Sequence, residues 1–275
     1  MEIRRRSEAH LAARLRCVEH ATVLRRHAEH RQVHSTDLPV WQFWAPDPEC
    51  APALVRNCMH SVAEHLSDRT VTVLDPASYG EFVRLPQHIE VRREQMGWTH
   101  FSDLLRIWLL ADHGGTWIDA TVMMSAPMPE HVDEVPFFAF SRPEDPFLLS
   151  SWFLHARPAH PIVLALRDML DDYWSHHETL ADYFLLHFMF ESAVTADRRL
   201  RQMWMDVPVH SFEPPHRLQS VLASEFDEHV LQEILATSWL HKLTWKMPPT
   251  ALDEGHFGEV LSRPRDEPRP HRRSR

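Results

Sequence analysis

The sequence predicts an α/β fold in which short buried strands alternate with amphipathic helices. Residues 40–44 and 70–74 are rich in β-branched and aromatic residues, as strands are, and a helical segment at 52–66 separates them. Strand, helix and strand in this order form a βαβ unit, whose strands run parallel through a right-handed crossover. A third strand is expected at 116–118, directly after an apolar helix and a glycine pair. The three strands together predict a parallel α/β half of a domain, of the kind that binds nucleotides.

Length and composition set the domain layout. At 275 residues, with 44% hydrophobic and 25% charged residues, the chain is long enough to bury one substantial core. We expect one α/β domain at 38–262, preceded by a charged helical extension at 1–37 and followed by a disordered tail at 263–275, where arginines alternate with prolines. The extension is either a solvated helix over the domain or a docking element for anionic lipid or a partner.

Charge and cysteine content exclude several classes of protein. A formal net charge of −10 argues against a general nucleic-acid binder, whose binding surface would be basic. Cys17, Cys50 and Cys58 are odd in number and lack metal-type spacing, so we expect reduced thiols. No apolar run approaches the roughly 20 residues of a membrane span, and no signal-peptide core follows the N-terminus. We therefore expect a cytoplasmic protein.

The first strands and helices have clear boundaries. The strand VWQFW at 40–44 runs into the breaker sequence APDP, and Pro52 stands in the first turn of the next helix. The second strand stops at Asp75-Pro76. Residues 78–98 predict a short helix, a break at Pro86 and a further helix that ends near Gly97.

The stretch FSDLLRIWLLADHGGTWIDATV at 101–122 organises the rest of the chain. Its apolar residues fall at helical spacing, so one face is buried, and Asp103 and Arg106 stand one turn apart beside it. Gly114-Gly115 suits a left-handed cap and a tight turn. The following strand carries Asp119 to its carboxyl end, where ligands bind in open α/β sheets.

Further strands and helices follow this stretch. A strand after Asp119 is expected to end at the APMP sequence, 126–129, and two more strands are expected at 135–140 and 150–156. Helices are expected at 161–174, 180–193 and 226–236, while 194–225 is uninformative. The last expected segment, 238–246, contains Lys242 and Lys246, the only two lysines among 29 Lys plus Arg residues. This concentration makes the segment a suspected phosphate contact.

The central stretch resembles a known family. The family pattern S-D-x-x-R followed by G-G-x-(Y/W)-x-D-x-D is matched here by Ser102, Asp103, Arg106, Gly114, Gly115, Trp117 and Asp119. On these residues the sequence resembles the DXD-containing glycosyltransferases. It is most similar to their bacterial capsular polysaccharide synthesis branch, which is related to fungal mannosyltransferases and clostridial glucosylating toxins. The resemblance spans about 38–248 and implies a GT-A fold, a Rossmann-like domain that binds nucleotide sugars, with additional helices.

The resemblance also implies roles for individual residues. A nucleotide-sugar donor would contact Ser102 and Trp117, and an aromatic side chain of the first strand, Trp41 or Phe43, would stack on the base. Arg106, Asp119 and one or both lysines would stabilise the leaving diphosphate, while Asp103 would hold donor hydroxyls. Asp182 and His187 would lie on the acceptor side. The alternatives are a plain Asp103–Arg106 ion pair, aromatic rings that only fill the sheet–helix interface, and an Asp182 and His187 that are satisfied inside a helix.

The second acid of the D-x-D motif is Thr121 in this chain. A carboxylate pair suits Mn²⁺ or Mg²⁺, so we expect a weakened metal site made by Asp119 and Thr121. The implied function is a hexosyltransferase, retaining by resemblance, that acts on a glycan or lipid-linked glycan in capsular or other surface polysaccharide synthesis. Its place would be the cytoplasm, with peripheral association with the inner membrane or a polysaccharide assembly complex. The alternatives are a noncatalytic subunit of such a complex and a protein-directed glycosyltransferase.

Overall fold

The computed structural model describes residue 17 and residues 38–142 and 145–264. The charged extension predicted at 1–37, apart from Cys17, lies outside the described residues. The predicted tail also lies outside them from residue 265 onward.

A five-stranded mixed sheet forms the centre of the protein. Its strand order is β2-β1-β3-β6-β5, with β2, β1 and β3 parallel and β6 antiparallel to both β3 and β5. The α/β class with a parallel, Rossmann-like part and additional helices is thereby confirmed. The strands are β1 (Val40–Phe43), β2 (Val71–Leu74), β3 (Gly115–Ile118), β5 (Phe137–Arg142) and β6 (Asp145–Ala156).

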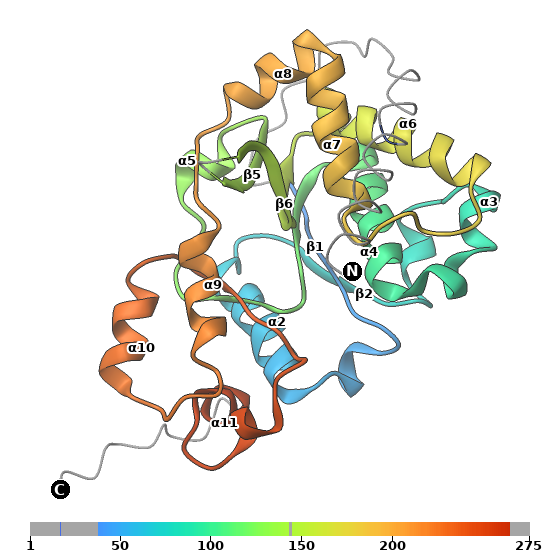
Figure 1. Cartoon of the computed structure of the whole chain (residues 1–275). Coiled ribbons are helices and arrows are strands. Elements are labelled where there is room, and N and C mark those ends of the chain that lie inside the picture. The colour runs from blue at the N-terminus through green and yellow to red at the C-terminus, as the bar shows by residue number, and fades with distance from the viewer. Residues whose placement is uncertain (1–16, 18–37, 143–144, 265–275) are drawn as a thin grey trace, which may run out of the picture.

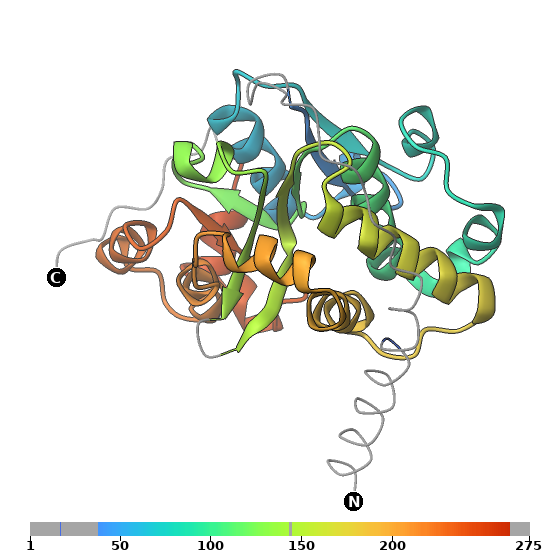
Figure 2. The ribbon, with the colours of Figure 1, turned by 90° about the horizontal axis from the view of Figure 1, so that it is seen from above.

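Helices cover both faces of this sheet, as Figures 1 and 2 show. One face carries α4 (Arg93–Asp112) and α6 (Pro161–His176), which pack on each other; the opposite face carries α2 (Ala53–His65). Because both faces are covered, β1 and β3 are buried at every position, and their sequences are apolar runs rather than alternating ones.

A second, two-stranded sheet connects the end of the chain to the central sheet. After β3 the chain turns at residues 119–121 and continues as β4 (Val122–Met124), which pairs with β7 (Leu240–Lys242). This pairing places Lys242 opposite Val122, three residues beyond Asp119. The closing segment, expected at 238–246, therefore lies beside the central stretch.

Two of the helical segments predicted from the sequence have different bounds in the structure. The helix expected at 180–193 begins later, as α7 (Leu185–Ala196), because the Asp182 side chain accepts a hydrogen bond from Phe184 N and caps the turn before it. The short helix expected before Pro86 is only the 3₁₀ turn Tyr79–Glu81. The further helix expected after Pro86 is α3 (Gln87–Glu90) followed by the start of α4, which is broken at Gly97 by a φ of 73°. The break predicted near Gly97 is thus confirmed, and α10 (Glu228–Leu235) lies where a helix was expected.

Several short helices escaped prediction. They bury few residues each, so their sequences lack a long apolar period; α8, for example, buries Leu200 and Trp204 and owes its start to Asp197, which accepts hydrogen bonds from Arg199 N and Leu200 N. These elements are α5 (Glu130–Asp133), α8 (Arg198–Met205), α9 (Glu213–Ser220), α11 (Phe257–Ser262) and the 3₁₀ turns at Pro48–Cys50 and Pro249–Leu252.

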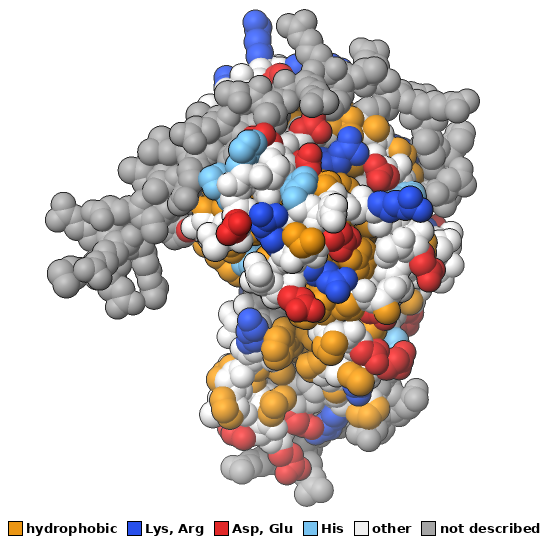
Figure 3. All heavy atoms as spheres, turned by 90° about the vertical axis from the view of Figure 1, so that its right-hand side faces the viewer, with side chains coloured by type: hydrophobic (Ala, Val, Ile, Leu, Met, Phe, Trp, Pro, Cys, Tyr) orange, Lys and Arg blue, Asp and Glu red, His pale blue; other side chains and the backbone are white. Residues whose placement is uncertain are grey.

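The surface of the described residues is mixed in charge. On the face shown in Figure 3, acidic and basic side chains are interspersed with hydrophobic ones. Among the helices of the described ranges, none has both the length and the apolar character required to cross a membrane.

The glycine pair before β3 is required by backbone geometry, and its replacement should destabilise the fold. Gly114 and Gly115 have φ values of 66° and 99°, and a Cβ on Gly115 would stand 2.1 Å from the carbonyl oxygen of Pro39. We expect Gly115→Ala to cost more than about 1 kcal/mol of unfolding free energy, because the backbone must move as well as adopt a strained φ.

Thermal denaturation followed by circular dichroism would measure this effect. Gly80→Ala is the matched control, since Gly80 has an ordinary φ and open space at its Cβ position. A Gly115→Ala protein that melts at the same temperature as the Gly80→Ala protein would show that the turn tolerates a side chain.

Candidate functional site

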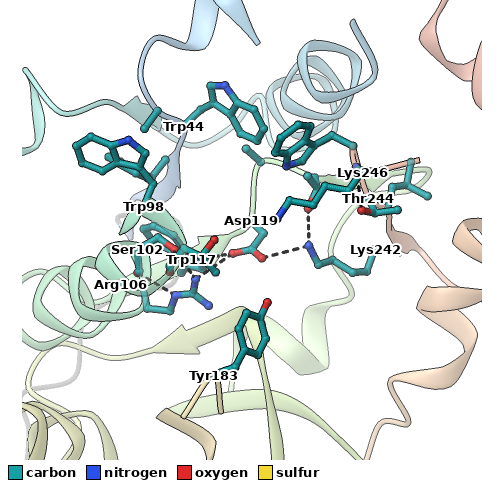
Figure 4. Close-up of a pocket in the computed structure, with 17 residues that line it drawn as sticks. Trp44, Trp98, Ser102, Arg106, Trp117, Asp119, Tyr183, Lys242, Thr244 and Lys246 are labelled. Carbon is teal, nitrogen blue, oxygen red and sulfur yellow. Dashed lines mark hydrogen bonds and ion pairs between the residues drawn. The ribbon is translucent and has the colours of Figure 1, made fainter. Parts of the chain in front are cut away.

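A pocket of about 440 Å³ opens at the carboxyl ends of the parallel strands. Strand β1 contributes Phe43 and the residues just beyond it, and the turn after β3 contributes residues 119–121. Parallel strands bring their carboxyl ends to one edge of the sheet, so these segments meet although they are far apart in sequence. The first half of α4, Tyr183 and the closing segment 242–246 complete the wall (Figure 4).

Asp119 is the charged centre of the pocket. Its Oδ1 accepts a hydrogen bond from Trp117 Nε1 at 2.9 Å and lies 3.3 Å from Arg106 Nη2, while its Oδ2 lies 3.2 Å from Lys242 Nζ. Burial by itself would raise the pKa of Asp119, but attraction to Arg106 and Lys242 and the hydrogen bonds from Trp117 and Lys242 outweigh it, and the pKa lies below its usual value. Asp119 is therefore a carboxylate at neutral pH.

Arg106 lies next to Asp119, and each nitrogen of its guanidinium contacts an oxygen atom of the protein. Its Nε donates to the backbone oxygen of Ser102 at 3.0 Å, its Nη1 donates to the backbone oxygen of Ser151, and its Nη2 donates to Ser102 Oγ at 3.0 Å. Nη2 is also 3.2 Å from Asp103 Oδ1, and the guanidinium lies over the Trp117 ring at 4.9 Å. With a side chain only 3% exposed and contacts to several protein groups, Arg106 is placed to orient Asp119. Its predicted contact with the leaving diphosphate stays a prediction.

Lys242 is the cation on the pocket side of Asp119. Besides its ion pair with Asp119, its Nζ donates a hydrogen bond to Thr121 Oγ1 (Figure 4). An ammonium group has three N–H donors, so these two acceptors leave one for a ligand. The contact depends on the pairing of β7 with β4, which carries Lys242 to the turn that bears Asp119 and Thr121.

Aromatic rings form the other side of the pocket. Trp44 and Trp245 meet edge to face with ring centroids 5.9 Å apart, and Trp98 packs beside Phe43 at 6.1 Å. Lys246 Nζ lies 5.5 Å from the centroid of Trp245, which is 46% exposed. The pocket thus places flat apolar surfaces next to two ammonium groups.

Tyr183 projects into the pocket from the turn before α7. In Figure 4 it points toward the Asp119–Lys242 pair. Burial raises the pKa of the Tyr183 phenol, and the carboxylates of Asp103 and Asp119 raise it further, against an opposing effect of Arg106. The hydroxyl is therefore protonated at neutral pH and is available as a hydrogen-bond donor.

The structure brings together most of the residues singled out from the sequence. Those that line the pocket are Phe43, Ser102, Arg106, Trp117, Asp119, Thr121, Lys242 and Lys246. Trp41 does not line it: its Nε1 donates to the Gly114 carbonyl oxygen at 3.0 Å and its ring packs on Phe82. Trp41 therefore fills the sheet–helix interface, which is the alternative stated for it above.

Asp103, Asp182 and His187 are not among the side chains that line the pocket. Asp103 lies behind it and pairs with Arg106, and Asp182 lies in the turn before α7 rather than inside a helix. His187, on α7, has a pKa lowered by burial, and the nearby charges of Asp103 and Arg106 shift it in opposite directions. The acceptor-side roles of Asp182 and His187 remain predictions.

Some pocket residues were not identified from the sequence. They include Trp44, Trp98, Tyr183 and Trp245. Two of them had a visible clue, because Trp44 ends the predicted first strand and Trp245 stands between the only two lysines. Trp98 and Tyr183 lie in segments whose orientation depends on packing, so no local pattern marked them.

The donor atoms around Asp119 do not fit a divalent metal ion. Both Asp119 oxygens already accept from or pair with Trp117, Arg106 and Lys242, and the Thr121 hydroxyl accepts from Lys242. Within the described part of the chain, no group of three or more His, Cys, Asp or Glu side chains could hold a metal ion. Mn²⁺ and Mg²⁺ prefer several oxygen ligands with negative charge, and here one carboxylate is shared between two cationic side chains.

The match to one family model agrees with the sequence resemblance. A family model described as "Capsular polysaccharide synthesis protein" matches residues 3–260. Among solved structures, one described as "PaToxG Glycosyltransferase" is similar at 12% sequence identity and a TM-score of 0.41, covering 73% of this chain and 83% of that one. A comparison with curated proteins gave no match.

Proposed function

Because this chain belongs to the capsular polysaccharide synthesis protein family, we propose that it is a glycosyltransferase that moves a hexose from a nucleotide-sugar donor to a glycan or lipid-linked glycan acceptor. One observation carries the proposal: the Asp119–Lys242 pair stands at the carboxyl ends of the parallel strands, in a pocket with an aromatic wall. A nucleotide sugar needs this combination, since it joins a flat base to a dianionic diphosphate and a polar sugar.

The diphosphate of the donor would bind at the two lysines. Lys242 retains one N–H donor beyond its bonds to Asp119 and Thr121, and Lys246 lies on the open side of the pocket. Their positive charges would stabilise the negative charge that grows on the diphosphate as it departs, and such fixed charges are the main source of catalysis in this kind of reaction.

The transfer step itself needs no covalent nucleophile. The bond between the anomeric carbon and the diphosphate oxygen breaks, and its electron pair leaves with the diphosphate. The acceptor hydroxyl oxygen then bonds to the anomeric carbon, and the hydroxyl proton passes to the departing phosphate oxygen. Attack from the face of the leaving group retains the anomeric configuration, in keeping with the retention implied by the resemblance.

Other pocket residues would position the reactants. Tyr183 points at the Asp119–Lys242 pair from the side opposite Trp44 and Trp98, so its hydroxyl would contact the donor sugar or the acceptor (Figure 4). Asp103 would act through Arg106, since its carboxylate pairs with Arg106 Nη2 at 3.2 Å and thereby supports Asp119.

The donor base would stack on the aromatic wall formed by Trp44 and Trp245. Stacking of a base on an aromatic side chain is worth about 1–3 kcal/mol, so we expect Trp245→Ala to raise the donor KM by roughly 5- to 150-fold with a smaller change in kcat. Steady-state kinetics with varied donor would measure the split. Trp245→Phe, which retains a ring, is the matched control; equal KM values for the two variants would argue against stacking.

A thermal-shift screen tests the proposed function. UDP-, GDP-, CMP- and TDP-sugars are added to the full chain, with Mn²⁺ and with EDTA, because a ligand that binds only the native state raises its melting temperature. We expect one nucleotide class to raise it, and release of free sugar or nucleotide from that donor then shows turnover. If no nucleotide sugar shifts the melting temperature of the folded protein, the proposal fails.

The same screen separates the alternatives. A noncatalytic subunit of a polysaccharide assembly complex would bind the donor without consuming it. A protein-directed glycosyltransferase would consume it and label a polypeptide rather than a glycan. The shared charge network of Asp119, Arg106 and Lys242 favours an active enzyme, because a pure scaffold has no need of it.

A further inference from the structure

Lys242 lies where a D-x-D motif would hold its metal ion. Its Nζ is 3.2 Å from Asp119 Oδ2 and hydrogen-bonded to Thr121 Oγ1, so it joins the side chains at the first and third positions of the motif. These two side chains are the ones that the sequence resemblance assigned as metal ligands. One ammonium group therefore bridges the oxygen atoms that a divalent cation would otherwise bridge.

The charges balance in the same way. A D-x-D motif offers two negative charges to an ion of charge two. In this chain Thr121 removes one negative charge, and a lysine supplies one positive charge to the remaining Asp119. With the charge of Arg106 counted against Asp103, both arrangements are neutral before the donor binds. A divalent ion beside Asp119, Thr121 and Lys242 would instead leave two uncompensated positive charges. The residue at 121 and the ammonium from 242 thus compensate each other.

The choice of lysine also fits the position. The chain has 29 Lys plus Arg residues, and its only lysines are at 242 and 246. An ammonium group is a compact point charge, while a guanidinium is a wide planar fork. The single nitrogen of the ammonium contacts Asp119 and Thr121 together, as one metal ion would, and its third N–H remains for a phosphate oxygen.

We propose that donor binding and sugar transfer by this chain require no divalent cation, because the Lys242 ammonium takes the position and the charge role of the metal. The inference rests on the proposed function, since it assumes a nucleotide-diphosphate donor in this pocket. It replaces the Mn²⁺ or Mg²⁺ that the sequence led us to expect.

Isothermal titration calorimetry on the unmodified full chain is the first test. UDP, GDP and TDP are titrated into protein stripped with EDTA and into protein with saturating Mn²⁺, and Mn²⁺ alone is titrated and followed by electron paramagnetic resonance. We expect the nucleotide Kd to be the same in both conditions and Mn²⁺ alone not to bind at the site. Stoichiometric Mn²⁺ binding, or a nucleotide Kd at least about tenfold weaker in EDTA, would overturn the inference.

Variants at the two motif positions provide the second test. Lys242→Met should weaken nucleotide binding at least about tenfold, the size expected for losing a hydrogen bond to a charged group, and Mn²⁺ should not restore it. The double variant Thr121→Asp, Lys242→Met rebuilds a carboxylate pair, so it should bind Mn²⁺ and should bind nucleotide only with Mn²⁺. Lys246→Met is the matched control, because it removes a lysine from the same segment without freeing Asp119, and it should not bind Mn²⁺.

The outcomes separate the two proposals. Nucleotide binding that depends on Mn²⁺ in the unmodified chain would contradict the metal-free inference but would not contradict the glycosyltransferase function. An absence of nucleotide binding in both EDTA and Mn²⁺ would contradict the proposed function, and the inference that rests on it. Circular dichroism of each variant confirms that any loss reflects the site rather than unfolding.

Discussion

Replacing Asp119 with Asn is expected to lower the rate of sugar transfer by at least about 100-fold, the loss that a small displacement of catalytic groups produces. Asp119 is the one carboxylate between Arg106 and Lys242, at 3.3 and 3.2 Å. Asparagine has nearly the same shape and no charge, so the two cations would repel each other across a neutral amide. Lys242 would then leave the position in which it meets the donor diphosphate.

Donor turnover by the purified Asp119→Asn protein measures this loss. Asp112→Asn is a suitable control, since Asp112 is also paired with an arginine, Arg167 at 3.1 Å, yet its side chain is 44% exposed and lies outside the pocket. Normal donor binding and turnover by Asp119→Asn would show that the central assignment is wrong.

Replacing Arg106 with Met is expected to lower both stability and activity. The side chain is 3% exposed, and its loss would leave Asp103 and Asp119 with no guanidinium between them. Removing one partner of a buried ion pair costs about 3–5 kcal/mol, and the lower end applies here because Asp103 and Asp119 are partly exposed. Each kcal/mol corresponds to roughly 2–4 °C of melting temperature in a domain of this size, so we expect a decrease of about 6–12 °C.

Urea unfolding and donor turnover would be measured on the same Arg106→Met sample. Arg167→Met is the matched control, because Arg167 makes one ion pair at the surface with a side chain that is 30% exposed, and such pairs contribute about 0–1 kcal/mol. In the double variant with Asp119→Asn the two losses should not add, since both act on one network. Additive losses, or equal stability of the two arginine variants, would show that Arg106 and Asp119 act independently.

Local patterns in the chain were enough to predict the framework of the site. Gly114 and Gly115 indicate a turn that only residues without a Cβ can make, and the apolar run before them indicates a buried helix. Asp119 directly follows the four residues of β3, so its place at the carboxyl end of that strand follows from its place in the sequence. Short-range steric contacts and the helical period determine these features, and both depend only on residues that are close together in the sequence.

The arrangement of the sheet and the pocket wall came only from tertiary packing. Periodicity does not reveal that β6 runs antiparallel beside β3. Nor does a local rule state which aromatic residue near the end of β1 lines the pocket: Trp41 packs into the sheet–helix interface, whereas Trp44, just past the strand, lines the pocket. Short capped helices such as α8 lack a long apolar stripe, and they escaped prediction for the same reason.

The sequence alone determined that Asp119 stands at a strand end behind a glycine turn, that Arg106 stands one turn from Asp103, and that Thr121 replaces the second acid of the motif. Only the tertiary structure decided what compensates for that replacement. Lys242 is far along the chain from Thr121, and the antiparallel pairing of β4 with β7 brings its ammonium to Asp119 and Thr121. The interaction energy of two charges depends on the distance between them in space, and that distance depends on how the whole chain packs.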